Sequence, residues 1–385
     1  MKKRNICVVV TARPSYSRIR SVLLEIERHA DLELQLVVSG TAILDKYGKT
    51  DDFIEKDGFT ITERVYNVLE GGNPTAMAKT TGMAILELST VFLNLKPDAV
   101  ITIADRYETI ATSIASSYLN IPLVHIQGGE VTGNIDEKVR HANTKLADIH
   151  FAASSQAMER ILKMGEDAEY VFNTGCPSID IAMELTKSSY LNFDPFMKYS
   201  GVGKTFDYEN GYIVVMQHPE TTEYRNSREQ IEETLHAVKE IHKPTFWFWP
   251  NSDAGTDGTS KGIRSFREAH RSMKVHFFKN MGSVDFLNLI KNAKCMVGNS
   301  SAGIRESAFL GVPVVNIGKR QESRDRAENV MDVWYDRTEI AKAINEQISH
   351  GPYNPSNLYG DGQSGRRIAE ILATVELRSH KTLTY

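Results

Sequence analysis

The chain has few cysteines and no long apolar run. Only three of its 385 residues are cysteines, and Cys7, Cys176 and Cys295 are far apart in the sequence. They form no disulfide framework and no zinc-ligand spacing, so a reducing cytoplasmic compartment is expected. The apolar run Ile6–Val10, after a basic N-terminus, is too short for a signal peptide or a membrane span. It predicts a buried strand.

A strong net charge is also lacking. Lys and Arg number 45 and Asp and Glu number 49, which gives a formal net charge of −4. This balance provides no basic field for nucleic acid or an anionic membrane, so neither partner is expected and a phosphate ligand must be bound locally. The 11 histidines include no His-Glu-x-x-His helix and no Cys/His cluster. We therefore expect no tightly bound catalytic metal.

Two common nucleotide-binding motifs are missing. Gly48-Lys-Thr50 and Gly203-Lys-Thr205 lack the preceding glycine that a phosphate loop needs. No Gly-x-Gly-x-x-Gly follows the first predicted strand, where the turn reads Thr11-Ala-Arg-Pro-Ser-Tyr-Ser17. In that turn Arg13 and Ser17 are expected to reach a phosphate, although an arginine facing solvent is the plainer alternative.

What the chain does contain is a regular alternation of apolar strands and amphipathic helices. In the first half, strands are predicted at 6–11, 34–39, 99–103 and 123–127, and helices at 16–28, 76–95 and 108–119. In the second half, strands are predicted at 212–217, 245–250, 275–278, 295–297 and 314–317, and helices at 229–242, 262–271, 284–292 and 303–310. This α/β pattern predicts two doubly wound, Rossmann-like domains.

The segment between the halves, 188–210, is irregular and predicts a linker or an extended crossover. We expect an N-terminal domain over residues 1–186 and a C-terminal domain over 187–364, facing each other across a cleft. A helical run at 366–377 predicts a last helix, at about 365–380, that packs back on the first domain. Ligands of such sheets bind at the carboxyl ends of the strands.

The strongest local signal is the turn Gly298-Asn-Ser-Ser301, which joins an apolar strand to a helix. Its small residues let backbone amides approach an anion, the hydroxyls of Ser300 and Ser301 can donate to phosphate, and the helix N-terminus adds roughly half a positive charge. Glu306, one turn further on, suits ribose hydroxyls. For this turn taken alone, an ordinary serine cap is the commoner explanation.

Acid and base candidates follow two predicted strands. Asp105 and Arg106 end one strand, although a structural ion pair is the commoner role for such a carboxylate. The next strand leads into a glycine-rich loop with His125, Glu130 and Asp136. Crowded, partly buried carboxylates acquire different pKa values, which prepares a proton donor beside a base.

Two features of the second half complete the set. Gln217-His218-Pro219 ends the first strand there, so His218 is expected to face the cleft; a capping role is the alternative. The aromatic run Phe246–Trp249 alternates within a strand and is interpreted as core rather than as a base-stacking surface.

In this order along the chain, these motifs resemble those of the hydrolysing UDP-N-acetylglucosamine 2-epimerases. The resemblance spans nearly the whole chain, and its specificity comes from the ordered set rather than from any one piece. The matching segments are Arg13-Pro-Ser-Tyr-Ser17, Ala104-Asp-Arg106, His125-Ile-Gln-Gly-Gly-Glu-Val-Thr-Gly-Asn-Ile-Asp136, Gly175-Cys-Pro-Ser-Ile-Asp180, Gln217-His-Pro219, Pro250-Asn-Ser-Asp-Ala-Gly255 and Gly298-Asn-Ser-Ser-Ala-Gly-Ile-Arg-Glu306.

The resemblance implies a two-domain GT-B fold and a cofactor-free reaction. UDP is eliminated across C1–C2 to give a 2-acetamidoglucal, and water then adds to give N-acetylmannosamine for nonulosonic (sialic) acid synthesis. The catalytic positions it implies are Asp105, Glu130, Asp136, His218 and the position of Gln127. The substrate-binding positions are Arg13, Ser17, Arg106, His125, Asp180, His218, Asn251, Ser300, Ser301, Glu306 and Arg320.

One position departs from the family pattern. Many members carry a carboxylate with an assigned catalytic role where this chain has Gln127. An amide cannot shuttle a proton, so either Glu130 or a water takes over, or Gln127 marks a different sugar. UDP-N,N'-diacetylbacillosamine, a precursor for legionaminic acid synthesis, is the alternative substrate, because an amide would suit its altered ring substituents.

Three other functions remain open from the sequence. A GT-B glycosyltransferase binds the same kind of donor with the same fold, but the carboxylate-rich loop argues against it. A non-hydrolysing epimerase would keep UDP attached, and a sensor would bind UDP-sugar without turning it over. A homo-oligomer, dimer or tetramer, is expected from the frequency of symmetric association.

Overall fold

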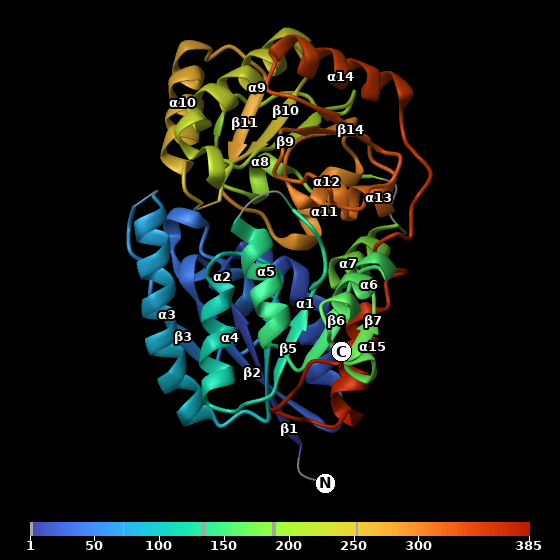
Figure 1. The fold of residues 1–385 in the computed structure, drawn as a ribbon. Coiled ribbons are helices and arrows are strands. Elements are labelled where there is room, and N and C mark those ends of the chain that lie inside the picture. The colour runs from blue at the N-terminus through green and yellow to red at the C-terminus, as the bar shows by residue number, and fades with distance from the viewer. Residues whose placement is uncertain (1–2, 72, 133–134, 187–189, 252) are drawn as a thin grey trace. The chain divides into compact units, whose positions relative to one another are not determined.

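The computed structural model describes residues 3–71, 73–132, 135–186, 190–251 and 253–385, which divide into two compact units (Figure 1). The first unit contains the described residues of Met1–Glu130, Ile135–Ile181 and Tyr359–Tyr385. The second contains those of Val131–Asn134 and Ala182–Leu358. Each unit has its own seven-stranded sheet.

The sheet of the first unit is parallel and has the order β3-β2-β1-β4-β5-β6-β7. Its strands are β1 (Arg4–Val10), β2 (Leu32–Ser39), β3 (Glu63–Val65), β4 (Ala99–Ile103), β5 (Leu123–Ile126), β6 (Ile149–Ala152) and β7 (Val171–Asn173). Its helices are α1 (Arg13–Arg28), α2 (Thr50–Lys56), α3 (Pro74–Leu95), α4 (Thr109–Tyr118), α5 (Ile135–Leu146), α6 (Ser155–Lys163) and α15 (Ser364–Thr374), and α7 (Pro177–Leu185) continues into the second unit. Short 3-10 helices cover Gly40–Ile43, Asp45–Tyr47 and Ala168–Tyr170.

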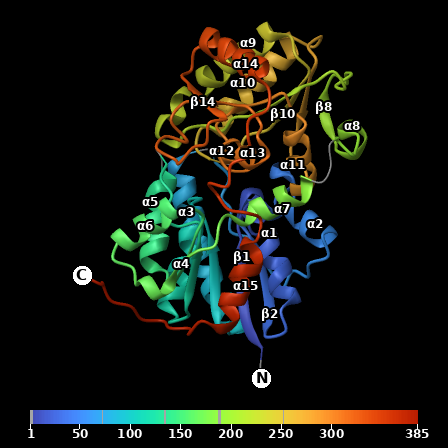
Figure 2. The ribbon, with the colours of Figure 1, turned by 90° about the vertical axis from the view of Figure 1, so that its right-hand side faces the viewer.

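Both faces of this sheet are buried, because alternate residues of β1 contribute to different cores. Ile6, Val8 and Val10 pack with α1 and α15, whereas Cys7 and Val9 pack with α3 and α4. This is why the strand reads as a continuous apolar run in the sequence. Helix α15 lies beside α1 (Figure 2), and a Cβ on Gly365 would come within 2.8 Å of the Ser21 backbone.

The sheet of the second unit has the order β14-β13-β12-β9-β10-β11-β8. Its strands are β8 (Gly201–Gly203), β9 (Ile213–Met216), β10 (Thr245–Phe248), β11 (Val275–Phe278), β12 (Cys295–Gly298), β13 (Val314–Ile317) and β14 (Val330–Val333). Its helices are α8 (Pro195–Lys198), α9 (Ser227–Ile241), α10 (Thr256–Ala269), α11 (Ser283–Lys291), α12 (Ser301–Ile304), α13 (Glu306–Leu310) and α14 (Arg337–His350), with a 3-10 helix at Thr221–Asn226. All strands are parallel except β8, which pairs antiparallel with β11.

One face of this second sheet carries the main core of its unit. Val215, Trp247 and Phe277 pack there with residues of α9, α10 and α14, which lie together in Figure 1. Phe246, Trp247 and Phe248 are all buried, which confirms that the aromatic run belongs to the core.

The predicted doubly wound α/β architecture is confirmed, with differences at the edges. The interpretation of 188–210 as irregular is wrong for α8 and for β8, which extends the sheet; residues 188 and 189 lie outside the described part. The predicted helix 303–310 is two short helices, α12 and α13, which are separated at Arg305. Helix α1 begins at Arg13 rather than at Tyr16, and the last helix ends at Thr374.

No helix in the described part of the chain is both long and apolar enough to cross a membrane.

Candidate active site

Two of the predicted site residues of the first unit, Arg13 and Asp105, lie where its strand order reverses. Strand β1 pairs with both β2 and β4, so successive crossovers leave β1 in opposite directions. Ligands of open α/β sheets bind beside such a reversal, at the carboxyl ends of the strands. Arg13 begins the helix that follows β1, and Asp105 follows β4. The topology therefore brings both residues to the binding edge.

Asp105 is held between two arginines. Its Oδ1 accepts a hydrogen bond of 3.1 Å from Nη1 of Arg18, and its Oδ2 accepts one from Nη2 of Arg140. The Asp105 and Arg140 side chains are 5% and 0% exposed. Two charge-assisted bonds fix the carboxylate in one orientation and stabilise its negative charge.

Arg140 connects Asp105 to the glycine-rich loop. Its Nη1 donates to the backbone carbonyl of Glu130 at 2.9 Å and to Oε2 of Glu137 at 3.0 Å. The charges of Asp105, Glu130 and Asp136 together raise the pKa of Arg140 against the lowering effect of its burial. Four positions besides His218 were predicted to be catalytic. Three of them, Asp105, Glu130 and Asp136, thus interact with this one buried guanidinium.

The buried ring of His125 helps to fix the backbone at this edge of the sheet. It is fully buried, its Nε2 donates to the Ala104 carbonyl at 2.9 Å, and its Nδ1 lies 3.1 Å from Oγ1 of Thr144. Ala104 has a φ of 62°, a strained value for a residue with a side chain, just before Asp105. Burial lowers the pKa of His125 to about 3. Both ring nitrogens of His125 are used inside the fold. Its predicted contact with the substrate stays a prediction.

Gln127 also points into the protein. Its side chain is fully buried, and Nε2 donates to Sγ of Cys176 at 2.9 Å. Sγ of Cys176 lies 2.9 Å from the Ser178 hydroxyl as well. Oε1 of Gln127 is buried and has no hydrogen-bond partner among the described residues. The amide nitrogen is therefore bound inside the protein, and the catalytic role predicted for this position stays a prediction.

Arg13 and Arg106 form the cationic part of this edge. Burial and the neighbouring positive charge of Arg106 lower the pKa of the Arg13 guanidinium to about 10. Arg106 Nε donates to Oε1 of Glu108 at 2.8 Å, which compensates part of its charge. Two neighbouring guanidinium groups favour a multiply charged anion such as a diphosphate. Ser17 is less suited to this task, because its hydroxyl donates to the Arg13 carbonyl at 3.2 Å.

The second unit has a matching reversal between β9 and β12. Asn299, directly after β12, is fully buried and joins the two strand ends. Its Oδ1 accepts from the backbone N–H of His218 at 2.7 Å, and its Nδ2 donates to the His218 carbonyl at 2.9 Å. The Asn299 carbonyl accepts a 3.3 Å hydrogen bond from Arg320. This one amide side chain therefore positions the backbone of His218.

The His218 ring is oriented by the next strand. Its Nδ1 accepts from the backbone N–H of Asn251 at 3.1 Å, so a neutral ring carries its proton on Nε2. A proton on Nε2 is suited to donation to a phosphate oxygen. Arg320 lies 3.7 Å from Oδ2 of Asp253, which follows the same strand. Hydrogen bonds and backbone segments thus connect four residues in one network: Arg320, Asn299, His218 and Asn251.

The Gly298–Ser301 turn has a backbone conformation that requires glycine at its first position. Gly298 has a φ of 126°, and a Cβ there would lie 2.1 Å from the Met216 carbonyl oxygen. Ser300 caps α12, its Oγ accepting from the Ala302 N–H at 3.3 Å. The dipole of the helix that follows the turn is weaker than predicted, because α12 has only four residues.

Glu306 has unused hydrogen-bonding capacity. Glu306 is 6% exposed, and its buried Oε2 has no hydrogen-bond partner among the described residues. A buried carboxylate oxygen without a donor is costly unless a ligand supplies one. Ribose hydroxyls are such donors, as the sequence suggested.

Asp180 has a structural task. Its two oxygens accept from the backbone N–H groups of Ser364 and Gly365, at 2.9 and 2.7 Å. The carboxylate therefore caps α15 and ties the C-terminal helix to α7. Its predicted role in substrate binding stays a prediction.

Sequence reasoning gave no role to Arg18, Arg140 and Asn299. The helical spacing of Arg140, four residues after Asp136, was a usable signal, since it puts both on one face of α5. Arg18 had no such signal, because its partner Asp105 is 87 residues away.

Comparison with known proteins gives a family-level match. The model of the family described as UDP-N-acetylglucosamine 2-epimerase matches residues 24–373. The chain is 32% identical over 376 residues to the UDP-N,N'-diacetylbacillosamine 2-epimerase (hydrolyzing) of Legionella pneumophila, covering 98% of this chain and 97% of the relative. It is 32% identical over 334 residues to the GDP/UDP-N,N'-diacetylbacillosamine 2-epimerase (hydrolyzing) of Campylobacter jejuni, covering 86% and 85%.

A solved structure shows the same fold. The UDP-GlcNAc 2-epimerase from Neisseria meningitidis, bound to UDP-GlcNAc, superposes with a TM-score of 0.77 at 20% identity, covering 96% of this chain and 99% of that chain. The two sheets and their helices therefore form the GT-B-like fold expected from the sequence.

Proposed function

The chain belongs to the UDP-N-acetylglucosamine 2-epimerase family, and we propose that it is a hydrolysing member that acts on a UDP-linked 2-acetamido sugar. The observation that carries this proposal is the near full-length similarity to a relative named as a hydrolysing 2-epimerase. The buried Asp105–Arg140 pair, together with Asp136 in the first turn of α5, supports it, because a two-step proton transfer needs carboxylates in fixed positions.

The proposed reaction begins with an elimination. A base removes the proton from C2 of the sugar, the C1–O bond to the diphosphate breaks, and UDP leaves behind a 2-acetamidoglucal. Water then adds its hydroxyl to C1, and a proton reaches C2 from the opposite face, which inverts that carbon. We assign the proton transfers to Asp105 and Asp136, with Glu130 as the further carboxylate of the loop.

The departing UDP needs cations and donors that stabilise its growing negative charge. In the first unit we assign phosphate binding to the Arg13–Arg106 pair, and in the second unit we assign it to a separate set of polar groups. Those groups are His218, Asn251, Ser300, Ser301 and Arg320. Glu306 is assigned to the ribose because its Oε2 has unused acceptor capacity.

We propose UDP-N,N'-diacetylbacillosamine as the substrate. Both relatives reported above are named for this sugar, and this chain has the uncharged Gln127 at the position of the family's usual carboxylate. UDP-N-acetylglucosamine is the second candidate, favoured by the description of the family model.

One NMR experiment tests both the reaction and the substrate. The purified protein is incubated in heavy water with either UDP-sugar and no acceptor. The expected products are free UDP and a free sugar with inverted C2 and deuterium at C2, formed faster from the diacetylated substrate. Absence of UDP release would contradict hydrolysis, and recovery of a C2-inverted UDP-sugar would indicate a non-hydrolysing epimerase.

Two variants test the proton transfers. Asp136→Asn should lower turnover by roughly 100- to 10,000-fold, because an amide cannot exchange the proton, while UDP affinity stays within a few-fold. Asp105→Asn should do the same, with a loss of stability because it breaks the buried ion pair. The matched control is Asp31→Asn, at an exposed carboxylate of the first unit. Unchanged turnover in both variants would refute the assignment.

A further inference from the structure

Glu220 is a buried carboxylate of the second unit, and no step of the proposed reaction uses it. It lies shortly after β9 and is 2% exposed. Its Oε1 accepts a hydrogen bond of 2.7 Å from the backbone N–H of Lys319 and one of 2.5 Å from the hydroxyl of Tyr335. A buried carboxylate needs such donors, because leaving it unsatisfied is costly.

The two donors belong to segments that follow two other strands of the same sheet. Lys319 follows β13, and Tyr335 follows β14. The sheet order is β14-β13-β12-β9, so Glu220 connects the end of β9 to the ends of β13 and β14. Parallel strands bring their carboxyl ends to one edge, where ligands of such sheets bind. Glu220 therefore ties together the segments at the ligand-binding edge of the second unit.

The loop 318–321 packs closely around this carboxylate. Gly318 has a φ of 75°, and a Cβ there would lie 2.3 Å from the hydroxyl oxygen of Tyr335 and 2.4 Å from Oε1 of Glu220. The backbone N–H of Gly318 donates to the Val333 carbonyl at 3.0 Å. The start of the loop is therefore fixed both by the backbone next to it and by the buried carboxylate.

This loop carries Arg320, which is assigned to phosphate binding. Arg320 Nη1 and Gln321 Nε2 donate to the same backbone carbonyl of Asn299, at 3.3 and 2.9 Å. Tyr335 forms a second connection to Asn299. Burial and the Glu220 carboxylate raise the pKa of its hydroxyl, and a hydrogen bond with the Asn299 side chain lowers that pKa. The loop and the turn that contains Asn299 thus share one hydrogen-bond network.

We propose that Glu220 and Tyr335 are positioning residues for nucleotide binding, which hold the loop 318–321 so that Arg320 is presented to a phosphate group. The inference rests on the role of Arg320 in the proposed function. A side chain that is held in place before the ligand arrives loses little conformational freedom on binding, whereas ordering a loose loop lowers affinity. Neither Glu220 nor Tyr335 has to touch the nucleotide for this effect.

Calorimetry with UDP and the full-length protein tests both residues. Glu220→Ala removes the acceptor of two hydrogen bonds and should weaken UDP binding at least roughly tenfold, whereas Glu220→Gln keeps an acceptor oxygen and should bind within roughly threefold of the unmodified protein. Tyr335→Phe is the milder variant and should also weaken binding. The matched control is Glu240→Ala, at an exposed carboxylate of α9. Equal binding by Glu220→Ala and this control would overturn the proposal.

A double-substitution cycle shows whether Glu220 acts through Arg320. Arg320→Ala should itself weaken UDP binding, and adding Glu220→Ala to it should change the affinity further by less than roughly threefold. The same loss from Glu220→Ala in both backgrounds would overturn the proposal. Failure of the proposed function gives a different result, because the protein would then bind UDP and show the cycle without hydrolysing either UDP-sugar.

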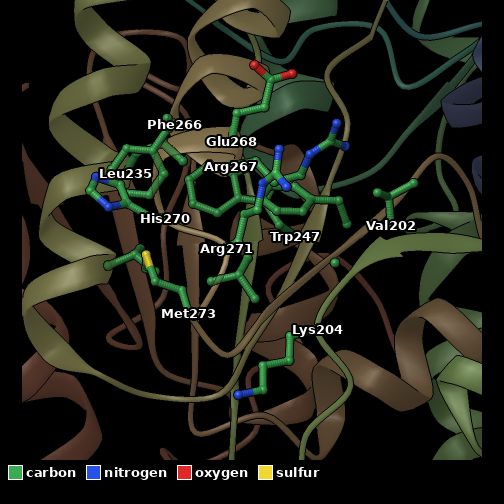
Figure 3. A pocket seen from close by; sticks show the side chains of 14 residues that line it. Val202, Lys204, Leu235, Trp247, Phe266, Arg267, Glu268, His270, Arg271 and Met273 are labelled. Carbon is green, nitrogen blue, oxygen red and sulfur yellow. The ribbon is translucent and has the colours of Figure 1, made fainter.

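Trypsin reports on the loop without any ligand, because it cleaves after Lys319 and Arg320 once the loop opens. Cleavage there should be at least roughly tenfold faster in Glu220→Ala than in the unmodified protein, and slow again in Glu220→Gln. The internal reference is cleavage after Arg271, an exposed residue between α10 and β11 that lines the hollow in Figure 3. Unchanged cleavage of the loop, or a parallel rise at Arg271, would overturn the proposal.

Discussion

Arg140 donates a hydrogen bond to the carboxylate of Asp105, and both side chains are almost completely buried. The same guanidinium donates to the backbone carbonyl of Glu130 at 2.9 Å. One side chain of α5 therefore holds together the segments that follow β4 and β5. The geometry of the proposed acid–base group depends on this arginine, which has no proton to transfer at neutral pH.

Replacing Arg140 with Met should cost stability as well as activity. The change leaves Asp105 buried with one of its two cationic partners missing, and breaking a buried pair in this way costs about 3–5 kcal/mol. Urea denaturation measures the loss. Arg28→Met removes an exposed pair with Glu25 and should change the free energy of unfolding by less than about 0.5 kcal/mol. Equal losses in the two variants would contradict the buried-pair argument.

The architecture was predictable because hydrophobic pattern determines it. Strands such as β4, β11 and β13 are short, buried and mostly apolar, and their predicted bounds match the observed ones. Strand β8 is Gly201-Val-Gly203 and fully exposed, so it has no apolar pattern by which it could be recognised. Its pairing with β11 depends on contacts with residues more than 70 positions away.

The site was predictable only in part, for a related reason. Residues at strand ends, such as Asp105 and His218, could be located because parallel strands bring their carboxyl ends to one edge. Which side chains then turn inward depends on partners distant in sequence. His125 and Gln127 stand in the same motif as Glu130, and only the three-dimensional contacts with Ala104 and Cys176 show that both are buried.

The buried His125 should make stability depend on pH. Its pKa is about 3 in the folded state against an ordinary value of 6.5, so below pH 6.5 the unfolded chain binds a proton that the folded chain does not. This contribution is complete above pH 6.5 and is lost as the pH falls toward 3, at about 1.4 kcal/mol per pH unit. Between pH 7 and pH 5 the loss is about 2 kcal/mol.

The variant His125→Gln isolates this effect. Gln can still donate to the Ala104 carbonyl but does not titrate, so the variant should lose about 2 kcal/mol less than the unmodified protein between pH 7 and pH 5. Urea denaturation at the two pH values gives the comparison. Parallel pH dependences would show that His125 is protonated in the folded protein.

Gly298 should not tolerate a side chain. A Cβ at this position would lie 2.1 Å from the Met216 carbonyl oxygen, and the φ of 126° is strained for any other residue. Gly298→Ala should therefore destabilise the protein by about 3 kcal/mol or more and weaken UDP binding. Gly82→Ala is the control, because a Cβ in the middle of α3 meets nothing within 4 Å. It should stabilise the protein by about 0.5–1 kcal/mol, measured by urea denaturation.

Glu306 should contribute to UDP affinity through the ribose alone. Its buried Oε2 has no hydrogen-bond partner among the described residues, and a hydrogen bond to a charged group contributes about 1.5–3 kcal/mol. Glu306→Gln should therefore weaken UDP binding roughly 10- to 100-fold in calorimetry. With 2',3'-dideoxy-UDP, which lacks both hydroxyls, the unmodified protein and the variant should bind alike. If the variant loses the same affinity for both nucleotides, Glu306 acts on the turn that precedes it and not on the ribose.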